Sequence, residues 1–183
     1  MRWDSAFAPR LAQYLIQERL QGGVIILSPS LGAEGRFFAG RPENPFDNVI
    51  AVWSPSAATD APIFAVVREL CFPLVSRAAQ SVVKVGDRAE YARRTSLAAV
   101  RCGDSLMTRL VPEVVVGYRR HWEGLLREGA RADPSSPTVA PATDPTLDAA
   151  VAVELRRTLI RVAPVQRPVP VLRAPHNPDW ESL

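Results

Sequence analysis

The beginning of the chain changes from a helical to an extended pattern of apolar side chains. Residues 5–20 place apolar side chains near one helix face, with glutamines and a glutamate opposite, and Gln21-Gly22-Gly23 follows them. The four apolar residues 24–27 lie between these glycines and Ser28-Pro29, as is typical of a buried strand. We therefore predict a helix over 5–20 and a strand over 24–27.

A second apolar run of strand length covers residues 49–53 and ends at Ser54-Pro55-Ser56. Between the two runs, residues 28–48 are rich in Ser, Pro, Gly and Asn, which predicts a long surface loop with a hairpin around 36–38. Two short strands can pair, but they need further strands or a helix to become stable. The pattern therefore predicts a small sheet that packs against helices.

The most apolar stretch of the chain follows Asp60-Ala61-Pro62, which can begin a helix because Asp caps it and Pro fits its first turn. Residues 63–80 are apolar on most of the helix circumference, so this helix should be central and buried. Pro73 lies inside it and is expected to kink it, because the proline ring displaces the carbonyl group of Glu69.

Three further helices are predicted downstream. Residues 87–110 are rich in small side chains, and this helix could divide at Gly103-Asp104. A fourth helix is predicted over 112–127, and a last one over 146–162 with Asp144-Pro145 as its cap.

These elements predict an α+β fold, with a small β-sheet packed against three or four helices. We expect the α+β domain to cover residues 1–128 and a flexible linker to cover 129–145, where prolines recur among small residues. The C-terminal helix, assigned to 146–163 in this division, is followed by a tail over 164–183. The tail contains five prolines and favours extended polyproline II.

Composition narrows the possible functions. The net charge is only +3, with a pI of about 9.3, which is too small an excess to indicate a nucleic-acid-binding face. No stretch approaches the roughly 18 consecutive apolar residues of a membrane span, and polar side chains interrupt residues 5–20 where a secretory core would lie. We expect a soluble protein, cytoplasmic by default, that binds no nucleic acid.

The chain has two cysteines, Cys71 and Cys102, both in apolar helical stretches. In such surroundings free cysteine behaves as a small hydrophobic residue, so two core thiols are predicted. A single Cys71–Cys102 disulfide is the alternative, and it would indicate an oxidising compartment.

The residues Arg68-Glu69-Leu70-Cys71-Phe72 lie in the middle of the predicted central helix. At such a place a zinc peptidase carries His-Glu-x-x-His. Together with the strand and turn Val24–Pro29 and the surrounding helix Phe64–Val75, they resemble the core of HExxH zinc peptidases of the gluzincin type. The resemblance covers about residues 10–110.

This resemblance implies a peptidase scaffold without its metal. Histidines at i and i+4 would share one helix face and reach one zinc ion, but Arg68 and Phe72 occupy these positions. Arginine stays cationic and phenylalanine has no donor atom. Glu69 matches the residue that deprotonates a zinc-bound water. The only histidines, His121 and His176, are far apart in sequence, so we expect no metal and no cofactor.

A structural role for Glu69 is also open. A buried glutamate commonly pairs with a cation, and Arg68 is expected to face elsewhere on the helix. The geometrically plausible partners lie on the next helix and would form a structural tie: Arg93, Arg94 or Arg101. A residual catalytic carboxylate and an exposed surface glutamate are the alternatives.

Three functions follow from these observations. The first is a non-catalytic accessory or protein-interaction subunit that contacts another protein or a larger assembly through its Pro-rich tail and its arginine-bearing helix surfaces. The second is a hydrolase with a non-standard site around Glu69. The third is a small-molecule-binding module in which Arg68 holds a ligand carboxylate in the former substrate cleft. The residues predicted to bind are Arg68, Arg93, Arg94, Arg101, Val169, Leu172 and Trp180.

Overall fold

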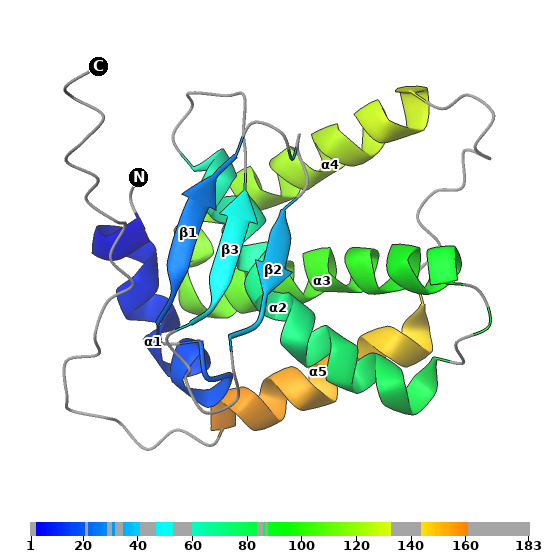
Figure 1. Ribbon diagram of the computed structural model, residues 1–183, viewed down its shortest axis with the longest axis horizontal. Helices are drawn as coiled ribbons and strands as arrows, with labels where there is room; N and C mark the ends of the chain where they lie inside the picture. The colour runs from blue at the N-terminus through cyan, green and yellow to red at the C-terminus, as the bar shows by residue number, and fades with distance from the viewer. Residues whose placement is uncertain are drawn as a thin grey trace.

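The computed structural model has an α+β fold in which a small sheet lies on a layer of helices (Figure 1). Residue 89 and residues 128–132 are described by their backbone alone. The residues that the structure describes are 3–20, 22–28, 31, 35–40, 47–52, 60–83, 86, 88–132 and 144–160.

The sheet has three strands, β1 (Val24–Leu27), β2 (Arg36–Phe38) and β3 (Val49–Val52), in the order β1-β3-β2. The two predicted strands, β1 and β3, pair in parallel, with Val24 opposite Val49. The segment expected to form a hairpin around 36–38 is instead a strand, β2, that pairs antiparallel with β3. The parallel pair explains the long connection between β1 and β3, because parallel strands cannot be joined by a tight turn.

The helices cover one face of the sheet (Figure 1). Successive side chains of a strand point to opposite faces, and Ile25, Phe37 and Ile50 pack against the core on the helix side. Val24 and Phe38 alternate with them and are 36% and 57% exposed. The outer face of the sheet therefore exposes apolar side chains, with Arg36 in the same row as Ile26, and carries no described helix.

The central helix α2 (Ala61–Val82) is buried along most of its length, as predicted. It contacts β2 and β3 on one side and the other long helices on the other. Pro73 lies within α2, and the helix extends past it to Val82. The side chains of Ile63, Leu70 and Leu74 form the middle of the hydrophobic core.

Helix α3 (Arg88–Leu110) is continuous, so the possible division at Gly103-Asp104 does not occur. Gly103 is instead a point of close helix contact, since a Cβ atom there would lie 2.1 Å from the Tyr118 hydroxyl oxygen. That hydroxyl donates a hydrogen bond to the Val100 carbonyl at 3.0 Å. The glycine therefore provides space for Tyr118 rather than a break in α3.

The remaining helices differ from the predicted ranges mainly at their ends. The first is a π-helical turn, Trp3–Phe7, followed by α1 (Ala8–Gln17), which ends before the predicted residue 20. A short 3-10 turn, Pro112–Val114, precedes α4 (Val115–Ala132), which extends into the range assigned to the linker.

The C-terminal helix α5 (Pro145–Ile160) packs into the same core as the other helices. Leu147, Val151 and Leu155 are buried, and α5 contacts α1, α2 and α3. Asp144 caps it as predicted, because the Leu147 N–H donates to the Asp144 carboxylate at 3.0 Å. Within the described ranges, no helix combines the length and apolarity needed to cross a bilayer.

Candidate functional site

A cavity of about 550 Å³ lies between α2, the end of α1 and the β2 segment. This volume is within the usual range for small-molecule sites. The residues that line it come from four parts of the chain: Glu18, Arg19 and Leu20 from the end of α1; Gly35, Arg36, Phe37, Ala39 and Gly40 around β2; Asn48 before β3; and Arg68, Glu69, Phe72, Pro73 and Ser76 from α2.

One face of α2 forms the helical wall of the cavity. Arg68, Phe72 and Ser76 follow one another at intervals of four residues, which places them along a single helix face. Glu69 and Pro73 lie beside them on the same wall. Positions 68, 69 and 72, which the sequence singled out, therefore all border one cavity.

The sequence predicted that Arg68 faces away from Glu69, and this is wrong, because the two side chains form an ion pair. The Arg68 Nη1 atom lies 2.5 Å from Glu69 Oε1, and its Nη2 atom donates to Ser96 Oγ at 2.5 Å. The guanidinium carbon lies 4.9 Å from the Phe72 ring centroid and 5.4 Å from that of Trp122, within cation–π range. Arg68 is thus a buried cation whose charge is already matched.

Glu69 is a buried carboxylate paired with an arginine, as predicted for a structural role. The partner is Arg68 and not one of the arginines of α3 that were predicted. The Glu69 side chain is 3% exposed. Gly35 is in close contact with this side chain: a Cβ atom on Gly35 would lie 2.6 Å from Glu69 Cγ, so only glycine fits here. Adjacent helix residues usually diverge, so the pairing with Arg68 could not be read from their spacing.

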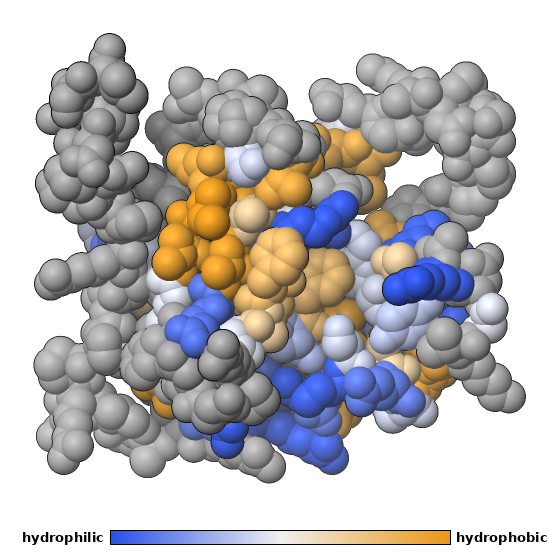
Figure 2. Space-filling model, in the orientation of Figure 1, coloured by the Kyte–Doolittle hydropathy of each residue, from blue (hydrophilic) through white to orange (hydrophobic). Residues whose placement is uncertain are grey.

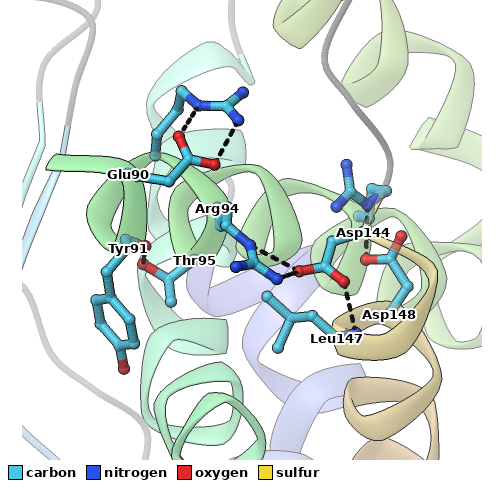
Figure 3. Close-up of polar contacts among 9 residues, drawn as sticks. Glu90, Tyr91, Arg94, Thr95, Asp144, Leu147 and Asp148 are labelled. Atoms are coloured by element: carbon cyan, nitrogen blue, oxygen red, sulfur yellow. Dashed lines mark hydrogen bonds and ion pairs between the residues drawn. The ribbon is translucent and has the colours of Figure 1, made fainter. Parts of the chain in front are cut away.

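The arginines expected to reach Glu69 bind other carboxylates instead (Figure 3). Arg93 pairs with Glu90 one turn away on α3, at 2.7 Å. Arg94 bonds to Asp144 through Nε at 2.8 Å, and Arg101 bonds to Asp148 at 2.8 Å. The last two pairs join α3 to the beginning of α5, so these side chains hold the fold together rather than line the cavity.

The carboxylate at the beginning of α5 is held in its charged form. Partial burial opposes ionisation of Asp144, but the hydrogen bonds from the Leu147 N–H and from Arg94 outweigh burial and lower the pKa of this carboxyl group. Asp144 is therefore both the helix cap and the ion-pair partner of α3.

The second acidic residue of the cavity wall, Glu18, is also neutralised within the fold. Its side chain is only 2% exposed, and both oxygens accept from Arg77, at 2.8 and 2.9 Å. The Thr158 hydroxyl of α5 adds a third bond at 2.8 Å. The bond with Glu18 raises the pKa of Arg77 more than burial lowers it.

Sequence reasoning missed Arg19, which has an unusual backbone at the cavity wall. Its φ is +57°, in the left-handed region that favours glycine. The N–H of Arg19 bonds to the Ile16 carbonyl at 3.1 Å, and that of Leu20 bonds to the Leu15 carbonyl at 2.7 Å. These two bonds form a Schellman motif at the end of α1, with an arginine at the position usually held by glycine.

Asn48 ties the parts of this wall together. Its side-chain nitrogen donates to the carbonyls of Arg19 and Gly22, and its oxygen accepts from the Gly40 N–H at 3.1 Å. A single side chain therefore connects the end of α1, the approach to β1 and the end of β2.

The other potentially reactive groups lie in or beside the core: the two cysteines are buried and His121 is half-buried. Cys71 and Cys102 are free thiols, as predicted for core cysteines, and burial raises the pKa of the Cys71 thiol. His121 packs against Phe64 and Trp122, and burial lowers its pKa. Among the residues that the structure describes, no three His, Cys, Asp or Glu side chains gather in a possible metal site.

The remaining predicted binding residues, Val169, Leu172 and Trp180, lie outside the described residues, as does His176. No family model, curated protein or solved structure matches this chain. The function is therefore argued from the cavity and its residues.

Proposed function

We propose that this chain is a non-catalytic domain that binds a small molecule in the cavity over α2, on a scaffold resembling a zinc peptidase without its metal ligands. The observation that carries the proposal is the convergence of positions 68, 69 and 72 on one cavity of about 550 Å³. Under this proposal, a former substrate cleft keeps its shape while its reactive residues serve the fold.

The state of Glu69 favours binding over hydrolysis. A general base needs an accessible carboxylate of suitable pKa near the proton it removes. Glu69 is instead buried, pressed by Gly35 and 2.5 Å from a guanidinium nitrogen. At the flanking positions, the cationic Arg68 would repel a divalent metal and Phe72 offers no ligand atom.

The contacts of Arg68 also change the expected mode of ligand binding. A guanidinium that already donates to Glu69 and Ser96 and lies near two aromatic rings has little capacity left for a ligand carboxylate. Arg68 therefore shapes the wall of the proposed site, and a ligand must find its polar contacts elsewhere.

A variant that fills the cavity tests the proposal. Ser76→Phe adds an aromatic ring to the helical wall, whereas Ser81→Phe places the same ring at an exposed position on the same helix. In a fragment screen by saturation-transfer NMR, we expect hits with wild type and Ser81→Phe that disappear with Ser76→Phe. Hits that survive in a folded Ser76→Phe protein place binding outside the cavity and contradict the proposal.

The hydrolase alternative has a separate test. Purified protein is assayed for zinc by elemental analysis and for hydrolysis of peptide and ester substrates, in wild type and Glu69→Gln. We expect less than stoichiometric zinc and no turnover that depends on Glu69. Stoichiometric zinc or turnover in wild type that is lost in Glu69→Gln rejects the non-catalytic function.

A further inference from the structure

The arginine at the end of α1 occupies a position where glycine is the least strained residue. Arg19 is the only non-glycine residue with positive φ among those described, and the two bonds of its Schellman motif require that conformation. Its backbone is further held by the hydrogen bond from Asn48 to its carbonyl. Strained residues cluster at ligand-binding and active sites, so the side chain of Arg19 is a candidate for a role in the cavity.

The charges around the cavity indicate what that use is. The Arg68–Glu69 and Glu18–Arg77 pairs neutralise the two acidic groups of the wall. The exposed side chain of Arg19 has no ion-pair partner among the described residues. The third arginine of the wall, Arg36, donates to the Gly35 carbonyl and has a further interaction of its own. Arg19 is therefore the cavity arginine to which the described residues supply no counter-charge.

The rest of the wall is suited to an apolar body. Leu20, Phe37, Phe72 and Pro73 line the same cavity as Arg19. Small-molecule sites commonly combine such apolar walls with a few polar groups that orient the ligand. Guanidinium groups bind carboxylates with charge-assisted hydrogen bonds, often two at once.

We infer that the cavity binds a small organic carboxylate with an apolar body, and that Arg19 holds its carboxylate. This inference rests on the proposed ligand-binding function and names the chemical class of the ligand. It also replaces Arg68 by Arg19 as the anion-binding residue.

The test compares 4-phenylbutyrate with its neutral amide, 4-phenylbutyramide, by titration calorimetry at low ionic strength. We expect wild type to bind the carboxylate about tenfold more tightly than the amide, the size of one charge-assisted contact. Arg19→Gly should bind both probes equally, while its thermal unfolding midpoint rises because glycine suits the backbone. Arg120→Gln, which removes an exposed arginine of α4 that does not line the cavity, is the control and should keep the preference.

The possible results separate the two proposals. A tenfold preference that persists in Arg19→Gly, or wild type that shows no preference or binds neither probe, overturns the assignment of a carboxylate to Arg19. Ser76→Phe shows which of the two proposals fails. If this variant still binds the probes, the cavity is not the binding site. If it loses them while Arg19→Gly keeps the preference, only the role of Arg19 is wrong.

A different observation concerns the apolar outer face of the sheet. Val24, Ile26 and Phe38 project from this face and are 36%, 45% and 57% exposed. Figure 2 shows a continuous hydrophobic area over β1 and its neighbours. Exposed apolar area of this kind is typical of a surface that another segment covers.

The C-terminal tail of the same chain has the composition and the starting point to cover it. Helix α5 ends at Ile160, beside α1, on the β1 side of the molecule (Figure 1). A polyproline II chain as long as residues 161 to 169 would span roughly 28 Å, at about 3.1 Å per residue. Polyproline II has three residues per turn, so Val169 and Leu172 would lie on one side of it.

We propose that residues 164–183 dock on the outer face of the sheet through Val169 and Leu172. Prolines cannot complete a strand ladder, so we expect the tail to lie across this face with Phe38 against its apolar side, as polyproline segments lie on aromatic surfaces. The occupant is then part of this chain, and the face is covered without a partner protein.

Photo-cross-linking of the full chain tests this docking. With p-benzoylphenylalanine in place of Leu172, we expect cross-links within one chain to peptides containing β1 or β2. Phe38→Asp should greatly reduce them, whereas Val116→Asp, at an exposed apolar position of α4, should not. Cross-links between two chains, or none to the sheet, would overturn the proposal.

Discussion

Arg68 and Glu69 show how neighbouring residues can determine each other's role. The carboxylate is buried because the guanidinium neutralises it, and the guanidinium is held between Phe72 and Trp122 by cation–π contacts. Its Nε atom is buried without a hydrogen-bond partner among the described residues. The pair is thus a buried ion pair with one incompletely satisfied donor, for which desolvation offsets much of the attraction.

Removing one member of this pair should cost more than removing both. We expect Arg68→Met to lower the free energy of unfolding by about 3 kcal/mol, because it removes the guanidinium group that pairs with a buried carboxylate. Arg68→Met combined with Glu69→Gln should recover part of that loss. Urea denaturation of the three proteins measures the difference, and a double variant no more stable than Arg68→Met would contradict it.

Among the elements, α5 is the helix whose beginning is joined to another helix, α3, by two ion pairs. Asp144 caps the helix through the Leu147 N–H and bonds to Arg94 of α3. One turn further along α5, Asp148 forms a second ion pair with α3, through Arg101. The N-terminus of α5 carries partial positive charge, so these carboxylates are also favoured by the helix dipole.

The contribution of Asp144 should depend on pH in a defined direction. Its folded pKa is lowered from 3.8, so its carboxylate stabilises the fold above pH 3.8, and this stability is lost as pH falls through the folded value. Asp144→Asn keeps a capping side chain but removes the charge. We expect its deficit in unfolding free energy to be present at pH 6 and to be lost as the pH falls through the lowered folded pKa of Asp144.

Asp144→Ala serves as the companion variant in the same urea titrations. It removes the cap as well as the charge, so it should be less stable than Asp144→Asn by about 1 kcal/mol at every pH. A deficit of Asp144→Asn that stays constant from pH 6 to pH 2.5 would show that the charge of Asp144 contributes nothing.

At the scale of the whole molecule, one hydrophobic core includes both the sheet and the C-terminal helix. Leu147, Val151 and Leu155 bury their side chains against helices that come much earlier in the chain. The end of α5 also reaches α1, where Thr158 donates to Glu18. The last described helix is therefore needed to close the core.

Truncation should reveal this dependence. A chain that stops after residue 143 loses α5 and exposes the apolar face of α2, so we expect it not to fold cooperatively. A chain that stops after residue 163 keeps α5 and should unfold in a single transition. Circular dichroism and tryptophan fluorescence during thermal unfolding measure both; a cooperative transition in the shorter chain would show that residues before α5 fold alone.

Local patterns in the sequence determined the helices and the strands β1 and β3, because periodicity depends on which neighbours in the chain are apolar. They also indicated the buried position of Glu69, since apolar residues surround it on α2. Element ends were less certain: α1 stops at Gln17 because a Schellman motif forms around Arg19, a residue whose type does not suggest it.

Only the tertiary structure decided which charges meet and where the cavity lies. Arg94 and Arg101 were candidates for Glu69 by sequence, yet the packing of α5 on α3 brings Asp144 and Asp148 to them instead. The cavity likewise joins the end of α1, β2 and α2, which are distant along the chain. Such pairings depend on the positions and rotations of whole elements, and no local pattern encodes these. The sequence therefore identified Arg68, Glu69 and Phe72 as residues of interest, and the fold placed Arg19 beside them.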